Sequence, residues 1–340
     1  MQVWLCKTRV DNMKPLISIV VPAYNEELVL HAFHAAMSQE IAIAADFQFE
    51  ILFINDGSTD KTQLMIEALA ATDPRVGSVD LSRNFGKEIA MTAGLDHAQG
   101  SAVIIIDADL QDPPSLIHEF IAEWKNGFDV VYAKRTHRDA ESWLKKITAK
   151  YFYKIISRIS DISIPTDTGD YRLLSRRAVD ALLKLREQHR FMKGLFAWIG
   201  FPTKAIYYRR QPRVAGNSKF SYWRLWNFAL EGITSFTIGP LKIATYLGFS
   251  ISFLSFLIGI WVIIKTLWWG EQVKGYPSLL ISVLFLGGIQ IFFIGILGEY
   301  LGRIYNETKN RPLYLIKNNT RARVNMNGES PDSSGPEKSP

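Results

Sequence analysis

Two aspartates one residue apart follow an apolar, β-branched stretch of the chain. The stretch covers residues 103–106 and leads directly into Asp107-Ala-Asp109. On an extended chain, residues i and i+2 project to the same side, so the two carboxylates converge where the strand leaves its sheet. Such hard oxygen ligands suit Mg²⁺ or Mn²⁺. A strand-end turn in which Asp caps the next helix would explain an isolated Asp-x-Asp equally well, but the other motifs favour the metal.

Buried apolar stretches alternate with helical segments over the first 135 residues. This βαβα order predicts a mostly parallel, doubly wound α/β sheet that helices cover on both faces. Ligands of such sheets bind at the carboxyl ends of the strands, and the polar motifs at 22–26, 55–60 and 82–87 fall there. The expected strands are 16–21, 50–54, 76–81, 103–106 and 129–133, and the expected helices include 27–38 and 88–97.

Composition restricts the class of protein further. The chain has 340 residues and a net charge of +6, which fits nucleic acid, an anionic lipid surface or a phosphate-bearing substrate as partner. Nucleic acid is disfavoured because there is neither a Cys/His cluster nor a basic recognition helix. The single cysteine, Cys6, precedes the first strand, so no internal disulfide is expected and a reducing compartment fits. No apolar stretch opens the chain at Met1, which argues against a cleaved secretory signal.

Two long uncharged stretches follow the α/β part. They comprise the 22 residues between Lys242 and Lys265 and the 24 between Lys274 and Glu299. Each is long enough to cross a bilayer as a helix, and buried helices of a soluble core rarely lack charge over such lengths. Basic residues concentrate before the first stretch and after the second, so both ends and the catalytic domain are expected on the cytoplasmic side. These residues are Arg213, Lys219, Arg224, Lys242, Arg303, Lys309, Arg311 and Lys317.

Three segments between the sheet and these stretches carry further polar chemistry. Residues 134–158 are rich in Lys, Arg and aromatics, as in a helix on anionic headgroups, although a solvated basic face fits too. Residues 167–172 are expected to form a short Gly turn. There Asp170 orients an acceptor or acts as a base, or else caps the turn or pairs with Arg172. Residues 213–219 are expected to form a flexible cationic loop able to close over phosphates, and residues 220–236 an amphipathic helix on the membrane surface.

These features divide the chain into six parts. The expected boundaries are an N-terminal extension at 1–14, a catalytic domain at 15–212, a phosphate loop with a membrane-surface helix at 213–239, transmembrane helices at 240–267 and 275–300, and a cytoplasmic tail at 301–340 that is disordered after about 318.

Three of the motifs together resemble the family 2 glycosyltransferases with the GT-A fold. They are residues 21–26 (Val-Pro-Ala-Tyr-Asn-Glu), 56–60 (Asp-Gly-Ser-Thr-Asp) and 107–111 (Asp-Ala-Asp-Leu-Gln), in the order of that family. The resemblance implies a nucleotide-sugar donor held through Mg²⁺ or Mn²⁺. The implied metal ligands are Asp107, Asp109 and Gln111, and the implied donor-binding residues are these three with Pro22, Tyr24, Glu26, Ile54, Asp56 and Ala108.

Residues 16–317 also resemble the polyprenyl-phosphate glycosyltransferases, in particular the bacterial bactoprenol glucosyltransferases of O-antigen glucosylation. Matching motifs include 82–88, 133–135, 169–173, 191–194, 213–220, 230–236 and 298–305. The resemblance implies glucose transfer from UDP-glucose to undecaprenyl phosphate at the bacterial inner membrane, for lipopolysaccharide or another envelope glycan, by a homotetramer. The resemblance also implies that Arg213 and Lys219 contact the donor phosphates and that Arg135 and Arg138 contact the acceptor phosphate. The implied catalytic residues are Asp107, Asp109 and Asp170.

Other functions are tested against the same residues. A processive polysaccharide synthase would need a Gln-x-x-Arg-Trp motif and more membrane spans, and the chain has neither. A non-catalytic nucleotide-sugar-binding protein of the membrane is disfavoured by the intact metal motif. The motifs leave the sugar open among glucose, N-acetylglucosamine, mannose from GDP-mannose and an aminoarabinose derivative. Since the motifs place no carboxylate pair for a covalent intermediate, we expect inversion at the anomeric carbon.

Overall fold

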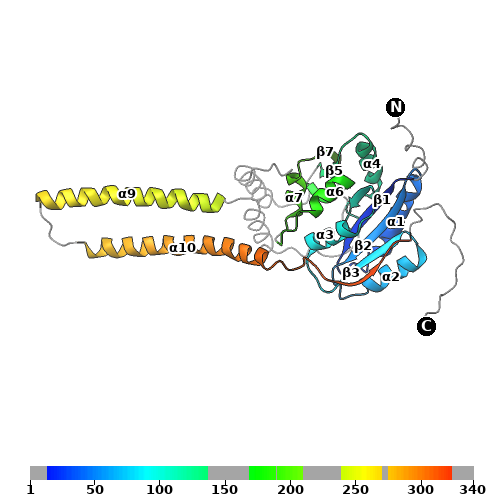
Figure 1. Cartoon of the computed structure of the whole chain (residues 1–340), viewed down its shortest axis with the longest axis horizontal. Coiled ribbons are helices and arrows are strands. Elements are labelled where there is room, and N and C mark those ends of the chain that lie inside the picture. The colour runs from blue at the N-terminus through cyan, green and yellow to red at the C-terminus, as the bar shows by residue number, and fades with distance from the viewer. Residues whose placement is uncertain (1–13, 137–167, 189, 210–238, 270–274, 324–340) are drawn as a thin grey trace, which may run out of the picture.

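The fold is built on one mixed sheet of eight strands in the order β7-β5-β6-β4-β1-β2-β3-β8. It is seen in a computed structural model that describes residues 14–136, 168–188, 190–209, 239–269 and 275–323 (Figure 1). The strands are β1 Leu16–Ala23, β2 Gln48–Asn55, β3 Val76–Leu81, β4 Ala102–Ile105, β5 Val130–Arg135, β6 Thr168–Ser175, β7 Thr203–Tyr208 and β8 Ile316–Thr320.

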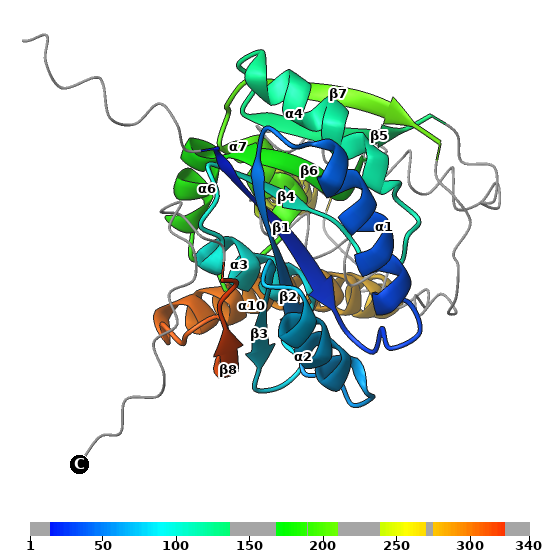
Figure 2. The same cartoon turned by 90° about the vertical axis from the view of Figure 1, so that its right-hand side faces the viewer.

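The doubly wound parallel core is confirmed. Strands β3, β2, β1 and β4 pair in parallel, and alternate residues of each strand enter two different hydrophobic cores. In β1, Ile17, Ile19 and Val21 pack on one face while Val20 packs on the other. The first face is covered by α1 Leu30–Ile43, α2 Thr62–Thr72 and α4 Ile117–Lys125, and the second by α3 Lys87–His97, α6 Arg176–Leu183 and α7 Met192–Trp198 (Figure 2).

The expected Gly turn at 167–172 is wrong in the part that the structure describes. Residues from Thr168 onward form β6, which lies antiparallel between β4 and β5. The expected fifth strand exists as β5 but is therefore not the neighbour of β4. Strand β6 could not be recognised from the sequence because Arg172, which is 4% exposed, occupies a buried position two residues before Leu174. A charged residue at a buried position interrupts the alternation of apolar and polar residues that indicates a strand.

The tail also departs from the expectation. Helix α10 Tyr276–Thr308 runs past residue 300, and the chain then returns to the sheet as β8, antiparallel to β3. Order continues beyond 318, since the amide of Arg323 donates to the carbonyl of Pro74 at 2.7 Å. All five residues of β8 are exposed. An edge strand held by backbone hydrogen bonds and by the ion pair of Lys317 with Asp80 needs no apolar pattern, so composition could not reveal it.

Helices α9 Gly239–Trp269 and α10 pack side by side and project away from the sheet (Figure 1). Within the described part of the chain, one stretch, Phe285–Thr308, is long and apolar enough to cross a membrane, with a mean hydropathy of 1.5. Large apolar side chains such as Phe253 and Ile291 stand exposed on the pair. The segments expected to lie on the membrane surface are 134–158 and 213–239. Lys134 and Arg135 belong to β5, so the helix expected from 134 onward is wrong there, and residues 137–158 and 213–238 are outside the described residues.

Helix α3 lies unusually close to the sheet because it presents Gly94 to β1. A β-carbon at Gly94 would stand 2.1 Å from Cγ1 of Val20, a rigid and fully buried side chain. We therefore expect Gly94→Ala to lower the free energy of unfolding by about 1–3 kcal/mol through overpacking. Thermal denaturation of the detergent-solubilised full chain measures this. In the double variant Gly94→Ala/Val20→Ala the loss of free energy of unfolding should be smaller than the sum of the losses in the two single variants. Losses that add exactly would contradict the close contact.

Candidate functional site

The site is created by the antiparallel pairing of β4 and β6. Ile105 of β4 pairs with Arg172 of β6. Continuing that register by two residues along β4 and two back along β6 sets Asp107 opposite Asp170. Two carboxylates separated by more than sixty residues in the chain therefore face each other at the carboxyl end of β4, where an α/β sheet binds ligands.

The ammonium of Lys87 lies between these carboxylates. Its Nζ is 2.7 Å from Oδ1 of Asp107 and 2.6 Å from Oδ2 of Asp170. Burial by itself raises the pKa of Asp170, but the charge of Lys87, and next that of Lys193, outweighs burial and holds this pKa well below its usual range. Burial likewise lowers the pKa of Lys87, yet Asp107 and Asp170 raise it above its ordinary value. The site thus holds two anions and a cation in direct contact.

Asp56 holds the loop that carries Lys87. Its two carboxylate oxygens accept hydrogen bonds from the amides of Phe85 (2.7 Å) and Gly86 (2.9 Å), and the residue is 3% exposed. The loop also crosses directly over Gly57, where a β-carbon would stand 2.3 Å from the backbone carbon of Arg83. Asp56, expected to bind the donor, therefore has a structural task as well: it fixes the start of α3.

The loops after β1 and β2 are joined to each other at the same edge. The side-chain oxygen of Asn25, a residue with φ of 55°, accepts from the amide of Thr59 at 2.8 Å. The amide of Glu26 donates to Oγ1 of Thr62 at 2.8 Å. Tyr24 is 36% exposed beside them. The first two donor motifs thus form one surface, with an accessible aromatic ring.

Other expected donor-binding residues differ in how they could contribute. Pro22 is the partner of Ile54 across β1 and β2 and is partly buried. The side chains of Ile54 and Ala108 are 0% and 3% exposed and pack in the two cores. They therefore shape the sheet beneath the site, and a ligand could meet only their backbone.

The arrangement of Asp109 fits both readings of the Asp-x-Asp motif. Its Oδ1 accepts the amide of Gln111 at 3.1 Å, closing a local turn around Leu110, whose φ is 56°. Within the described part of the chain, no three His, Cys, Asp or Glu side chains gather closely enough to enclose a metal. Mg²⁺ typically takes only one or two carboxylates and completes its shell with phosphates and water. Asp107 and Asp109, partly exposed, fit a metal held in that way.

Arg135, at the end of β5, lies beside the same strand as Asp170. Its Nε donates to the hydroxyl of Tyr208 at 3.3 Å, and that hydroxyl donates to the buried carboxylate of Asp112. A β-carbon on Gly169 would be 3.4 Å from Nη2 of Arg135. The guanidinium is thereby fixed next to the site. The other expected cations, Arg138, Arg213 and Lys219, lie outside the described residues.

A further charged layer lies below Asp170. Glu88 accepts the amide of Met192 at 2.9 Å, and burial, followed by the charge of Asp170, raises the pKa of Glu88 to about 7. Arg172 donates to the carbonyls of Gly169 and Asp170 and stacks over Phe196 at 3.7 Å. The carboxylate of Asp170 is thus paired with Lys87, whereas Arg172 bonds the backbone.

Sequence reasoning assigned no role to Lys87, Glu88 or Lys193, although all three lie in motifs that it singled out. One signal was present for Lys87. It is the first residue of α3, and a cation is disfavoured at a helix N-terminus. A residue that breaks a local rule in this way marks a functional position.

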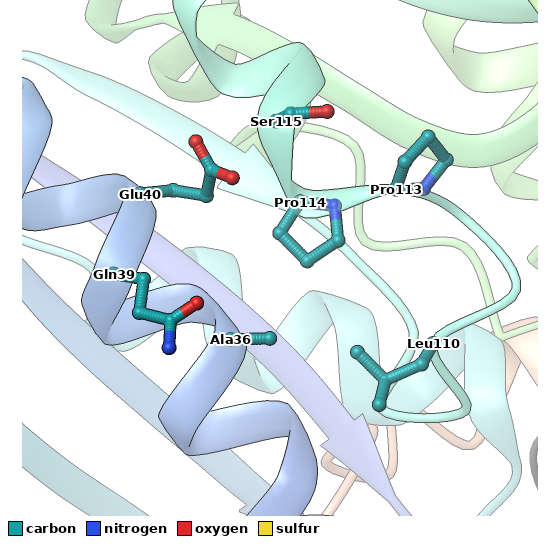
Figure 3. A pocket seen from close by; sticks show the side chains of 7 residues that line it. All are labelled: Ala36, Gln39, Glu40, Leu110, Pro113, Pro114 and Ser115. Atoms are coloured by element: carbon teal, nitrogen blue, oxygen red, sulfur yellow. The ribbon is translucent and has the colours of Figure 1, made fainter.

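A separate pocket of about 330 Å³ lies between α1 and the loop that follows Asp109 (Figure 3). None of the expected site residues lines it. Its walls are Ala36, Gln39, Glu40, Leu110, Pro113, Pro114 and Ser115.

Comparison with known proteins agrees with this geometry. The model of glycosyl transferase family 2 matches residues 18–183, and that of the GtrB C-terminal hairpin matches residues 239–304. A bactoprenol glucosyl transferase of Shigella phage SfV is 51% identical over 89% of this chain and 98% of its own length. The chain belongs to the family 2 glycosyltransferases.

Two further similarities are found. A glycosyltransferase of Synechocystis is 51% identical over 88% of this chain and 94% of its own length. Glucosyl-3-phosphoglycerate synthase of Mycobacterium tuberculosis superposes with a TM-score of 0.44 at 18% identity, over 65% of this chain and 78% of that one. The match to the hairpin model shows that this glycosyltransferase carries the membrane-associated C-terminal hairpin that the sequence predicted.

The role of Asp56 in this glycosyltransferase can be tested without substrate. In Asp56→Asn one acceptor oxygen becomes an NH₂ donor facing a backbone donor, so one of the two hydrogen bonds is lost and residues 83–87 loosen. We expect faster amide hydrogen exchange in that segment, measured by mass spectrometry. Asp60→Asn is the matched control, because Asp60 bonds the amides of Glu27 and Thr62 instead. Equal exchange at 83–87 in Asp56→Asn and the parent would contradict the anchoring role.

Proposed function

We propose that this glycosyltransferase transfers glucose from UDP-glucose to undecaprenyl phosphate with inversion, and so makes the lipid-linked sugar for O-antigen or another envelope glycan. The observation that carries the proposal is the 51% identity with a bactoprenol glucosyl transferase, which runs through the catalytic domain and the hairpin alike. The convergence of Asp107, Asp170 and Arg135 at one sheet edge supports it independently.

On the donor side, Asp107 and Asp109, with Gln111, would hold Mg²⁺ or Mn²⁺. Such an ion, when bound, neutralises the charge that develops on a departing nucleoside diphosphate. The exposed ring of Tyr24 offers a surface for the nucleoside, and the loop of Arg213 and Lys219 would cover the phosphates. Arg138 would assist on the acceptor side.

The acceptor's own chemistry removes the need for a strong base. A phosphate monoester has its second pKa near about 6, so its oxygen is already anionic at neutral pH. Asp170, held anionic by Lys87 with a low pKa, is a weak base and is better suited to position the acceptor. What the acceptor requires is a cationic contact that offsets its repulsion from the donor diphosphate. Arg135 supplies it with a planar guanidinium.

The membrane arrangement follows from the hairpin. Both α9 and α10 would cross the bilayer of the bacterial inner membrane, with the catalytic domain on the cytoplasmic side, where the basic residues concentrate. The proposal includes the division of the chain into a catalytic domain at 15–212, a phosphate loop with a surface helix at 213–239 and transmembrane helices at 240–267 and from 275 onward. It also includes assembly into a homotetramer.

A donor screen tests the function directly. Purified full-length protein is incubated with undecaprenyl phosphate and each of UDP-glucose, UDP-N-acetylglucosamine and GDP-mannose, and the lipid product is identified by mass spectrometry and NMR. We expect turnover with UDP-glucose to exceed that with the others, and a β-linked product. Preference for another sugar would replace glucose in the proposal. An α-linked product would mean retention of configuration and contradict inversion.

The metal assignment predicts a large loss on removal of either carboxylate. Asp107→Asn and Asp109→Asn each replace a charged ligand by a neutral one, and we expect turnover to fall by two orders of magnitude or more, with EDTA acting similarly on the parent. Asp180→Asn is the matched control, since Asp180 is 57% exposed on α6. Full activity of Asp109→Asn in EDTA would defeat the assignment.

The acceptor assignment predicts a selective effect at Arg135. Arg135→Ala should raise the apparent KM for undecaprenyl phosphate more than that for UDP-glucose, and Arg135→Lys should retain more activity than Arg135→Ala because it keeps the charge. Steady-state kinetics with each substrate varied in turn measures both. Arg186→Ala serves as control, because Arg186 pairs with Asp96 at the far end of α3. An equal rise of both KM values would indicate general damage instead.

A further inference from the structure

The position of Lys87 at the start of α3 is not explained by the helix itself. It is the first residue of α3, where the helix dipole disfavours a positive charge. Gly86, with a φ of 100°, and the two hydrogen bonds to Asp56 fix the preceding backbone. The favourable partners of the ammonium are carboxylates of two other strands, Asp107 and Asp170. The position of Lys87 is therefore determined by the site.

The ammonium of Lys87 contacts the same oxygens of Asp107 that a divalent cation in the donor complex would need. It lies 2.7 Å from Oδ1 and 2.8 Å from Oδ2 of Asp107, so it addresses both oxygens of an expected metal ligand. A divalent cation at Asp107 would stand within a few ångströms of this ammonium, and like charges at that distance repel strongly. The two cations therefore compete for Asp107.

Asp170 is a second carboxylate partner for the ammonium of Lys87. Its Oδ2 contacts Lys87, while its buried Oδ1 has no hydrogen-bond partner among the residues that the structure describes. The Lys87 side chain as a whole is 43% exposed although its ammonium is enclosed between the two carboxylates, so the flexible stem has room to move. An ammonium that leaves Asp107 can keep its contact with Asp170.

We propose that Lys87 is an exchangeable counter-cation of the site: it holds Asp107 and Asp170 together before the donor binds, and it yields Asp107 to the divalent cation while remaining with Asp170. This inference rests on the proposed metal site at Asp107. It makes Lys87 a positioning residue that keeps the two carboxylates from repelling each other and adds positive charge beside the acceptor.

Metal affinity tests this independently of turnover. Binding of Mn²⁺ to the full-length protein in detergent is measured by electron paramagnetic resonance, with and without UDP. Lys87→Met removes the competing charge, so its Kd for Mn²⁺ without UDP should be lower than the parent's by roughly tenfold or more. Lys87→Arg keeps a cation that binds carboxylate with two parallel hydrogen bonds, so its Kd should be higher. Lys125→Met is the control, because Lys125 packs over Phe47 on the opposite edge of the sheet.

The outcomes separate this inference from the function on which it rests. If the parent binds Mn²⁺ no better than Asp109→Asn does, even with UDP, the metal site itself is wrong. If the parent binds Mn²⁺ but Lys87→Met binds it equally or more weakly, Lys87 merely supports the loop and the exchange is overturned. Should Lys87→Met fail to fold, Lys87→Arg decides alone: a Kd equal to or below the parent's overturns the proposal.

Discussion

The contact of one ammonium with carboxylates from two oppositely directed strands is the interaction on which this site depends. The register of β4 and β6 forces Asp107 and Asp170 towards each other, and two adjacent carboxylates without a cation would repel or take up a proton. Lys87 resolves that conflict within the protein. Because the fold brings Asp107 and Asp170 close together, a cation such as Lys87 is needed between them to keep both carboxylates charged.

That requirement extends back into the nucleotide motifs. Lys87 is held because Asp56 binds the two amides before it, and Asp56 can approach them because Gly57 leaves space for the crossing backbone. The loop after β2 is in turn joined to the loop after β1 by Asn25. The position of the ammonium therefore depends on the loops that follow both β1 and β2.

The sequence predicted the parallel core well because buried β-branched strands and their order determine such a sheet locally. Asp107 and Asp109 could be found because they directly follow a strand, and their assignment as metal ligands stays a prediction. Strands β6 and β8 were missed for different reasons: a buried Arg172 disguises β6, and β8 is exposed along its whole length and mostly polar. The contact of Lys87 with Asp107 and Asp170 arises only from the pairing of β4 with β6. Long-range register of this kind is not written in any single segment.

Helix α3 connects this site to the hairpin. Its first residue is Lys87, and eleven residues, about 16 Å along the axis, bring it to His97. Near that end Asp96 accepts the hydroxyl of Tyr314 at 2.7 Å, in the segment that follows α10. The base of α10 is also fixed, since Glu307 accepts the amide of Gln188 at 2.7 Å. Because Gly94 has no β-carbon, α3 packs directly against Val20 of β1. A hairpin seated in a bilayer would then set the height of the carboxylates above it, which suits an acceptor whose phosphate stays at a fixed depth.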